Sequence, residues 1–291
     1  MELNTSILEK KKFRAYLEIL GTSLAWALSA VLLKMYIEQV PPYHLLTGRF
    51  VIATIFIFAM RPNTVKAINK ENLKVGIPLG FFIFLAYASG IVCLKYTTAS
   101  KSSFLVSLSV LFVPLIESFM RRKLPSKWIF VSVIISILGL RLISGMDGTG
   151  YNIGDTLAIL SSVFYSIYIV LMDRTGKDIE EMILTLIQLG VVSICGTIVL
   201  LFYEGLNFQY FKIILIPIFV IGILCTGMST LFQTRAQKVA SSESVGILLL
   251  GEPLFTTILA FIVLKETILI SGFIGGILIL LSLVIAIIKK V

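Results

Sequence analysis

One carboxylate, Glu252, lies near the middle of an apolar stretch that covers residues 244–264. If this stretch crosses a bilayer, an ionised side chain at that depth is costly unless it faces a partner or a watery cavity. Pro253 follows directly, and inside a membrane only neighbouring protein or a cavity can compensate the backbone donor that a proline removes. The pair predicts an inward-facing helix beside a solvated pocket, where Glu252 titrates or anchors a solute by a hydrogen bond. The alternative is a protonated Glu252 that donates an interhelical hydrogen bond, with Pro253 as a packing kink.

Aromatic and hydroxyl side chains are further candidates, because a pocket for a small amphipathic solute needs flat apolar walls and a few placed polar groups. Four aromatic residues fall well inside apolar runs: Trp26, Tyr87, Tyr165 and Tyr168. Trp and Tyr that face lipid prefer the membrane interface, so these four are expected to point inward. Ser103 and Ser107 share a helix face and complete the predicted substrate-binding set, although close helix packing explains each serine equally well. Gln188 and Thr226 are weaker candidates of the same kind.

Beyond the first apolar run, three other charged residues lie within such runs. Arg141 and Glu117 are near the ends of their runs, where long side chains reach the interface, and Glu117 precedes Arg121 by four residues. Both are expected to have structural roles. Arg49 lies about two turns into its run, roughly 9 Å deep. It could attract an anionic group there, but an interhelical tie is the favoured interpretation.

The composition indicates that membrane-spanning helices carry these residues. Of the 291 residues, 57% are hydrophobic and 14% are charged, and the mean hydropathy of +1.00 is outside the range of soluble domains. The net charge of +9 comes from bases in short loops, which indicates membrane topology and not a nucleic-acid partner. The three cysteines have no metal-type spacing, so no disulfide, metal or cofactor site is predicted.

A bilayer core of roughly 30 Å requires about 20 apolar residues per helix, and ten runs of about that length occur. They cover residues 16–36, 44–60, 75–94, 102–120, 128–146, 156–172, 182–203, 213–232, 244–264 and 268–288. The short connections predict a compact all-α bundle in the membrane. The first run is too long for a signal peptide and is expected to remain as an uncleaved span.

The distribution of Lys and Arg among the loops predicts the orientation of the chain. With a cytoplasmic N-terminus, 18 of the 25 Lys and Arg residues fall on the cytoplasmic side, and seven fall in outer loops or within spans. Because bases in short loops stay on the cytoplasmic side, both termini of this multi-pass protein of the cell membrane are expected in the cytoplasm. An even number of spans, such as ten, satisfies this expectation.

The ten spans divide into two halves, residues 1–146 and 147–291, whose sequences resemble each other. The comparison places Ser109 opposite Glu252 in the fourth span of each half. An odd number of spans per half requires the second copy to be inverted in the membrane. We therefore expect ten transmembrane helices in two inverted five-helix repeats.

The loop charges agree with this inversion. Residues 121–127 carry four bases and are expected on the cytoplasmic side, whereas the corresponding loop of the second half carries only Lys265 and Glu266 and is expected outside. Inverted repeats suit alternating access, because the two copies can exchange conformations around a site near the midplane.

Three segments of the sequence closely resemble the EamA branch of the drug/metabolite transporter superfamily. They are residues 96–128, the Arg49-Phe50 pair and residues 248–268, within a resemblance that extends over roughly residues 15–287. The resemblance implies ten helices in two inverted repeats, a central cavity lined by helices 1, 3, 4, 6, 8 and 9, and export of small metabolites, often amino acids. The sequence departs from the family at Ser109 and Val110, where many relatives carry an aromatic residue or a proline. The cavity wall is therefore expected to be more polar here.

Transporter, intramembrane enzyme and non-transporting scaffold or sensor are the three classes that we weigh. Serine and metal-dependent membrane proteases need histidines, and the one histidine, His44, lies at the mouth of the second span. An aspartyl protease needs two acids inside the bilayer, but Asp155 and Asp173 lie at span ends. No phosphate-binding GxxxxGK[ST] motif occurs. A scaffold has less reason to keep a midplane carboxylate.

The sequence thus favours a secondary active or facilitative transporter that exports small metabolites, such as amino acids, related compounds or toxic analogues, by alternating access. Its expected partners are a small-molecule solute, the lipid bilayer and, if export is proton-linked, protons. An uptake permease of the same fold is the alternative.

Small residues four apart occur in the two last spans of the halves, Ser132 and Ser136 in one and Gly272 and Gly276 in the other. Such spacing lets helix backbones approach closely. We expect these helices to pack within one chain, which predicts a monomer. A homodimer through the same two helices is the alternative.

Overall fold

The computed structural model describes residues 2–122, 124–144, 150–239, 248–267 and 269–288, and within these ranges the chain is helical and contains no strand. The first half contains α1 (Glu2–Tyr36), α2 (Pro42–Met60), η1 (Pro62–Ala67), α3 (Lys70–Cys93), α4 (Ala99–Val106), α5 (Ser109–Met120) and α6 (Lys127–Ser144). The second half contains α7 (Ile153–Leu171), η2 (Met172–Gly176), α8 (Glu181–Val199), η3 (Leu200–Glu204), α9 (Phe208–Ile213), α10 (Leu215–Val220), η4 (Ile221–Met228), α11 (Ser229–Val239), α13 (Gly251–Leu259), η5 (Ala260–Leu264) and α14 (Ile270–Ile288).

Seven helical stretches of the described residues are long and apolar enough to cross a membrane. They are Phe13–Tyr36, Pro42–Met60, Lys70–Cys93, Ala99–Met120, Ile153–Gly176, Glu181–Glu204 and Leu215–Lys238, and each overlaps one predicted span. The other three predicted spans overlap α6, the apolar helix Gly251–Leu264 and α14, while their residues 145, 146, 244–247 and 268 lie outside the described residues. The chain is therefore a multi-pass membrane protein built from helices.

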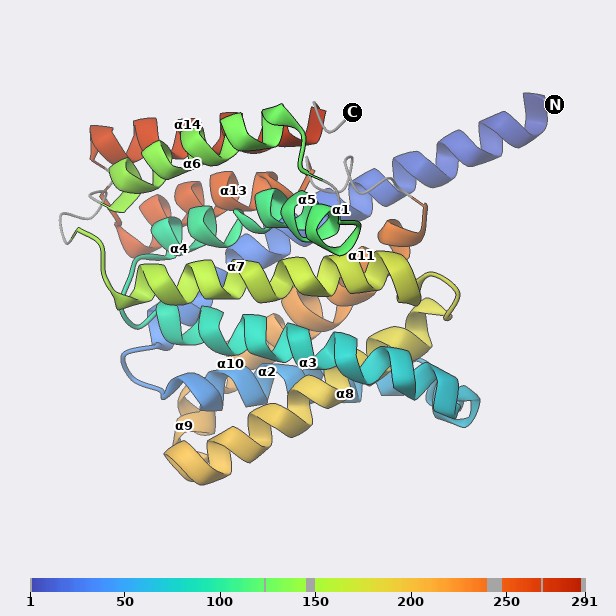
Figure 1. The fold of residues 1–291 in the computed structure, drawn as a ribbon. Coiled ribbons are helices and arrows are strands. Elements are labelled where there is room, and N and C mark those ends of the chain that lie inside the picture. The colour runs from blue at the N-terminus through green and yellow to red at the C-terminus, as the bar shows by residue number, and fades with distance from the viewer. Residues whose placement is uncertain (1, 123, 145–149, 240–247, 268, 289–291) are drawn as a thin grey trace.

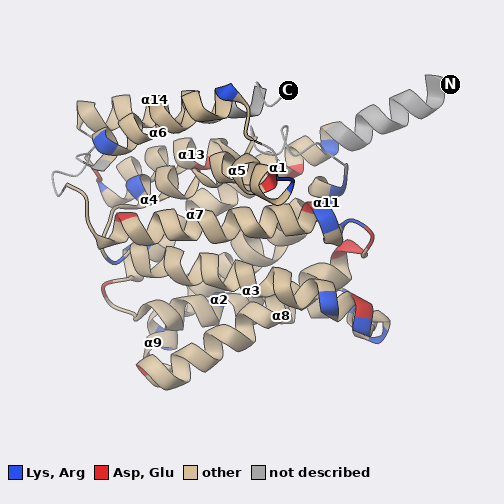
Figure 2. Ribbon diagram, viewed as in Figure 1, with Lys and Arg blue, Asp and Glu red and all other residues tan. Residues whose placement is uncertain are grey.

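The helices run back and forth between two ends of the molecule, and α1 begins at the end where α14 finishes (Figure 1). We call this the terminal end; the opposite end, which contains the loops before α2, α4, α7 and α14, is the far end. Lys and Arg gather at the terminal end, around the start of α3 and the end of α11 (Figure 2).

Helices from the two halves of the chain interleave. α1 packs against α11 and α13, and α7 packs against α3, α4 and α5. α2 and α3 both pack against α8, and α2 also packs against η4. The core of the bundle is therefore built from helices of both halves.

Two spans are locally broken. Around Ser107 the chain between α4 and α5 tightens to a turn, in which the Leu108 amide donates to the Leu105 carbonyl (3.2 Å). A second turn residue, Leu250, directly precedes α13. Both breaks place polar side chains and loosened backbone inside the bundle, an arrangement that a membrane allows only where protein or a cavity surrounds it.

The small residues of α6 and α14 pack these two helices against each other within the chain, as expected. The closest approach uses Gly139 and Gly275, because a Cβ on Gly275 would lie 2.7 Å from the Gly139 carbonyl oxygen. Ser136 and Ser282 add a hydrogen bond of 2.6 Å between their hydroxyls. Gly276 instead faces the ring of Phe104, so the contact is shifted by one residue from the predicted Gly272 and Gly276 pair.

Candidate functional site

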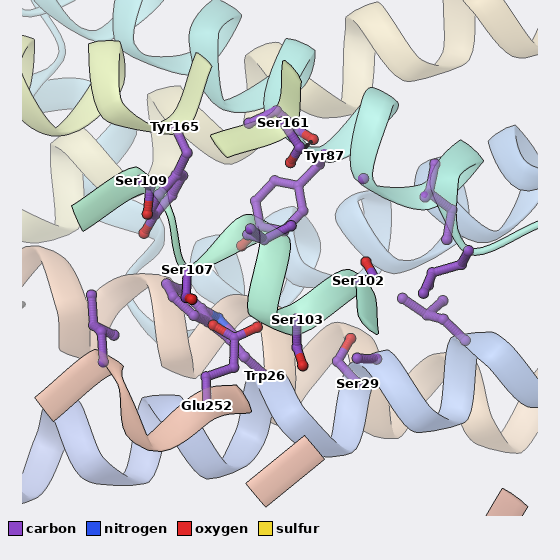
Figure 3. Close-up of a pocket in the computed structure, with 18 of the residues that line it drawn as sticks. Trp26, Ser29, Tyr87, Ser102, Ser103, Ser107, Ser109, Ser161, Tyr165 and Glu252 are labelled. Carbon is purple, nitrogen blue, oxygen red and sulfur yellow. Dashed lines mark hydrogen bonds between the residues drawn. The ribbon is translucent and has the colours of Figure 1, made fainter. Parts of the chain in front are cut away.

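A cavity of about 1000 Å³, the space at its opening included, lies among the helices of both halves. Its lining comes from α1, α2, α3, α4, α5, α7, η4 and the segment from Leu249 to Glu252 (Figure 3). It extends from Trp26 and Glu252 toward Leu33 and Leu94, which lie close to the far end of α1 and α3.

The structure brings six of the seven predicted site residues together in this lining. They are Trp26, Tyr87, Ser103, Ser107, Tyr165 and Glu252. Tyr168 does not line the cavity. Its side chain is 1% exposed and its ring lies behind Tyr165, with 5.4 Å between centroids, so it supports the wall.

Aromatic rings from three helices form much of the apolar wall. Trp26 meets Tyr165 edge to face with 5.9 Å between centroids, the geometry that aromatic pairs prefer. Tyr87 packs in the same manner on Phe50 at 5.0 Å. Within the described residues the indole Nε1 of Trp26 has no hydrogen-bond partner, so a donor is left over beside the cavity.

The serines offer the cavity mainly acceptor oxygens. Ser103 donates its hydroxyl proton to the Ser100 carbonyl (2.8 Å), and Ser107 donates to the Phe104 carbonyl (2.7 Å). Their remaining lone pairs can accept a hydrogen bond from a solute. Because Ser107 lies in the turn between α4 and α5, helix packing alone does not account for its position.

Glu252 extends from the first turn of α13 into the cavity (Figure 3). The free amides at the start of a helix stabilise a negative charge. No hydrogen bond or ion pair is found for its carboxylate among the described residues, which leaves both oxygens available to a solute cation, a donor or water. The interhelical hydrogen bond of the alternative interpretation is therefore not formed within the described part of the chain.

Arg49 is the cationic residue of the lining, and the prediction of an interhelical tie describes only part of its surroundings. Its Nη1 donates to Ser29 Oγ of α1 (3.2 Å), and its guanidinium lies over the rings of Tyr87 and Phe50, 4.7 Å and 4.9 Å from their centroids. These contacts do join α1, α2 and α3. The same group also lines the cavity, so attraction of an anionic group, the less favoured interpretation from the sequence, is compatible with its position.

The remaining polar candidates lie outside the lining. Glu117 is partly buried, and Arg141 is exposed. Gln188 and Thr226 are buried in the helix packing and do not line the cavity, although the neighbour Cys225 does.

Several lining residues were not singled out as site residues from the sequence: Ser29, Ser102, Ser109, Ser161 and Cys225. The spacing of two of them carried a usable signal, since Ser161 precedes Tyr165 by four residues and Ser29 follows Trp26 by three, on the same helix faces. Ser109 had been aligned with Glu252, and both line the same cavity.

A buried ion pair at the far end was also missed. Lys101 and Asp155 both have fully buried side chains, and Lys101 Nζ lies 3.0 Å from Asp155 Oδ2 and donates to the Gly150 carbonyl (2.9 Å). The pair connects α4 of the first half to α7 of the second.

A second connection reaches the same turn of α4. Glu266, in the loop before α14, accepts hydrogen bonds from the amides of Ala99 (2.8 Å) and Ser100 (3.2 Å) and from the Ser100 hydroxyl (2.7 Å). A carboxylate here satisfies the free amides at the helix start. The first turn of α4 is thus held to the second half of the chain at two points.

Similar proteins of known sequence are described as transporters. The chain is 23% identical over 275 residues to an uncharacterized transporter of Archaeoglobus fulgidus, covering 94% of this chain and 86% of the relative. A second uncharacterized transporter of that organism is 26% identical over 277 residues, covering 91% and 94%. An uncharacterized transporter of Bacillus subtilis is 23% identical over 300 residues, covering 98% and 90%.

Among solved structures, one crystal structure matches 95% of this chain and 96% of its own chain, with a TM-score of 0.65 and 17% identity. At 17% identity this similarity shows a shared fold and nothing about function. The sequence profile of the EamA-like transporter family matches twice, over residues 13–145 and 152–288. The chain therefore belongs to the EamA-like transporter family, within the drug/metabolite transporter superfamily.

Proposed function

We propose that this protein is a secondary active or facilitative transporter that exports small metabolites, such as amino acids or related compounds, across the cytoplasmic membrane. The observation that carries this proposal is the cavity, in which a carboxylate without a partner among the described residues, that of Glu252, lies with aromatic walls and serine hydroxyls inside a membrane-spanning bundle. A small amphipathic solute fits such a lining, because its apolar part can pack on Trp26 and Tyr165 while its polar groups meet Glu252 and the serines.

The mechanism we propose is alternating access between two inverted repeats of five spans, residues 1–146 and 147–291. The paired helix contacts support it, since α1 packs on α11 and α13 as α7 packs on α3, α4 and α5. The family profile also matches once in each half. The breaks at Ser107 and Leu250 occupy corresponding places in the two halves and border the cavity, as discontinuous helices do in transporters with inverted repeats.

Polar contacts between the halves occur at both ends of the molecule. At the far end, Lys101 pairs with Asp155 (3.0 Å). At the terminal end, Arg235 of α11 pairs with Glu18 of α1 (3.1 Å), and Ser23 donates to the Leu248 carbonyl (3.0 Å). Alternating access requires that the contacts of one end break while those of the other hold, so these two sets are the proposed gates.

We further propose that the terminal end faces the cytoplasm, because the bases gather there (Figure 2). Both termini are then cytoplasmic and the far end is outside. The two halves together supply all walls of the cavity, so a monomer is sufficient for transport.

The test is solute efflux from proteoliposomes that hold purified full-length protein and are loaded with a metabolite extract. Mass spectrometry identifies the compounds that leave faster than from protein-free vesicles. We expect Glu252→Gln to abolish the response of efflux to an imposed pH gradient, because the amide cannot carry a proton in exchange. Glu71→Gln is the matched control, since Glu71 is a solvent-exposed acid outside the cavity.

Two results count against the proposal. If no compound leaves faster than from empty vesicles, the transport function is wrong. If Glu252→Gln moves solute at the wild-type rate with an unchanged response to pH, Glu252 does not titrate during transport.

A further inference from the structure

Arg49 has hydrogen-bond donors that no described residue accepts from. Its side chain is 4% exposed, and within the described residues its one hydrogen bond runs from Nη1 to Ser29 Oγ (3.2 Å). Its Nε has no hydrogen-bond partner in the described part of the chain, and no described carboxylate forms an ion pair with the guanidinium. A guanidinium carries five N–H donors in a rigid fork, so most of its hydrogen-bonding capacity is left over.

A purely structural tie would explain this arrangement poorly. A buried cation is stable when it is paired and hydrogen-bonded, and leaving one without a counter-charge is costly. The faces of the guanidinium are covered by the rings of Tyr87 and Phe50, which attract a cation but accept no strong hydrogen bond. The edge of the fork is what remains for an acceptor.

The geometry points to Arg49 as the group that binds a carboxylate of the transported solute. This inference rests on the proposed function and assigns it a chemical class: solutes that carry a single planar anionic group. A carboxylate matches the fork because its two oxygens can accept two parallel N–H donors. Ser29, bonded to Nη1, holds the guanidinium in place for this contact.

The other charge of the lining decides between anion classes. Glu252 is also in the cavity and has no counter-ion among the described residues, so the described lining carries one basic and one acidic side chain. A solute with one carboxylate and one ammonium group neutralises both. A phosphate ester with two charges would leave one negative charge facing Glu252, and like charges at a buried site are strongly unfavourable. The cavity therefore favours a monocarboxylate that also carries a cation.

The experiment measures the ratio of the transport rates of two matched solutes. Proteoliposomes with full-length protein and a metabolite extract first identify transported compounds. Each transported carboxylic acid is then compared with its amide, which has the same shape without the negative charge. We expect the wild type to prefer the acid by about 10- to 100-fold, the range for a charge-assisted hydrogen bond in a dry site.

The variants are Arg49→Gln, which removes the charge and the fork, and Arg49→Lys, which keeps the charge alone. We expect the acid-to-amide preference to fall to about one in Arg49→Gln and to an intermediate value in Arg49→Lys. Arg141→Gln is the matched control, because Arg141 is an exposed arginine outside the cavity. Size-exclusion chromatography checks that each variant is folded. If Arg49→Gln does not fold, the test is made with Arg49→Lys alone.

Each outcome decides the inference. If a variant slows acid and amide equally and leaves their ratio unchanged, Arg49 is only an interhelical tie. If the transported compounds lack carboxylates, or if they are phosphate esters, the assigned solute class is wrong while the transport function stands. If the wild type transports nothing from the extract, the proposed function itself fails.

Discussion

Removing the negative charge of Asp155 is expected to destabilise this protein strongly. The side chains of Asp155 and Lys101 are both fully buried, with Oδ2 and Nζ 3.0 Å apart, so Asp155→Asn removes the negative charge that faces the Lys101 cation in a site that water does not reach. Breaking a buried pair in this way typically costs about 3–5 kcal/mol. The amide oxygen of Asn can still accept from the backbone amide of Asn152, which Asp155 accepts now (3.2 Å), so the cap of α7 is largely kept and the loss reports the ion pair.

The measurement is the apparent midpoint of thermal unfolding in detergent at a fixed scan rate, because membrane proteins often unfold irreversibly. At about 2–4 °C per kcal/mol for a chain of this size, the expected decrease is about 6–20 °C. Asp173→Asn is the matched control: Asp173 pairs with Lys177, and their side chains are 36% and 50% exposed. An exposed pair contributes about 0–1 kcal/mol, so the midpoint should fall by less than about 4 °C.

The double variant Lys101→Met with Asp155→Asn separates charge from packing. It also removes the buried cation of Lys101, so it should unfold at a higher temperature than Asp155→Asn alone. The reasoning is refuted if Asp155→Asn and Asp173→Asn lower the midpoint equally. It is also refuted if the double variant unfolds at a lower temperature than Asp155→Asn, by as much as an independent loss of the Lys101 side chain would cost.

Three further perturbations test other parts of the structure. Trp26→Ala removes an aromatic wall of the cavity and should weaken solute binding about tenfold or more, measured by ligand-induced thermal shift; unchanged affinity would remove Trp26 from the site. Gly275→Ala places a Cβ 2.7 Å from a backbone oxygen of α6 and should destabilise by about 1–3 kcal/mol, whereas Gly21→Ala, with open space around it, should not; equal thermal midpoints would contradict the helix contact. Glu266→Gln weakens the hold on α4 and should make the cavity thiol of Cys225 react faster with an impermeant reagent added outside, in protein whose other two cysteines are alanine; unchanged labelling would mean that this contact is no gate.

The positions of the spans were predictable because a bilayer leaves the backbone few choices. An apolar run of about 20 residues cannot satisfy its amides with water in the membrane, so it forms a helix. For the same reason the charge of Glu252 and the polar ends of Trp26 and Tyr165 could be assigned to the interior, and all three line the cavity. Residue type and depth were sufficient for this inference.

What could not be predicted depends on contacts between residues far apart in the chain. Lys101 and Asp155 are separated by 54 positions, and each taken alone reads as a charge near the end of a span. Tyr168 has the same type and depth as Tyr165 and lies three positions along the same face of α7, yet its ring packs behind that of Tyr165 and does not line the cavity. Hydropathy does not distinguish the two tyrosines, since the one that supports the wall and the one that forms it are both buried.

The first turn of α4 connects the proposed gate to the solute site. Ser100 and Lys101 hold the far end to the second half of the chain through Glu266 and Asp155, and the next two residues, Ser102 and Ser103, line the cavity. The turn around Ser107 lies only one helical turn further along and frees this short segment from the rest of its span. A movement that releases the two carboxylates must therefore also displace the serines that face the solute. Opening of the far end and a change in the binding site are then the same event, which is the coupling that alternating access requires.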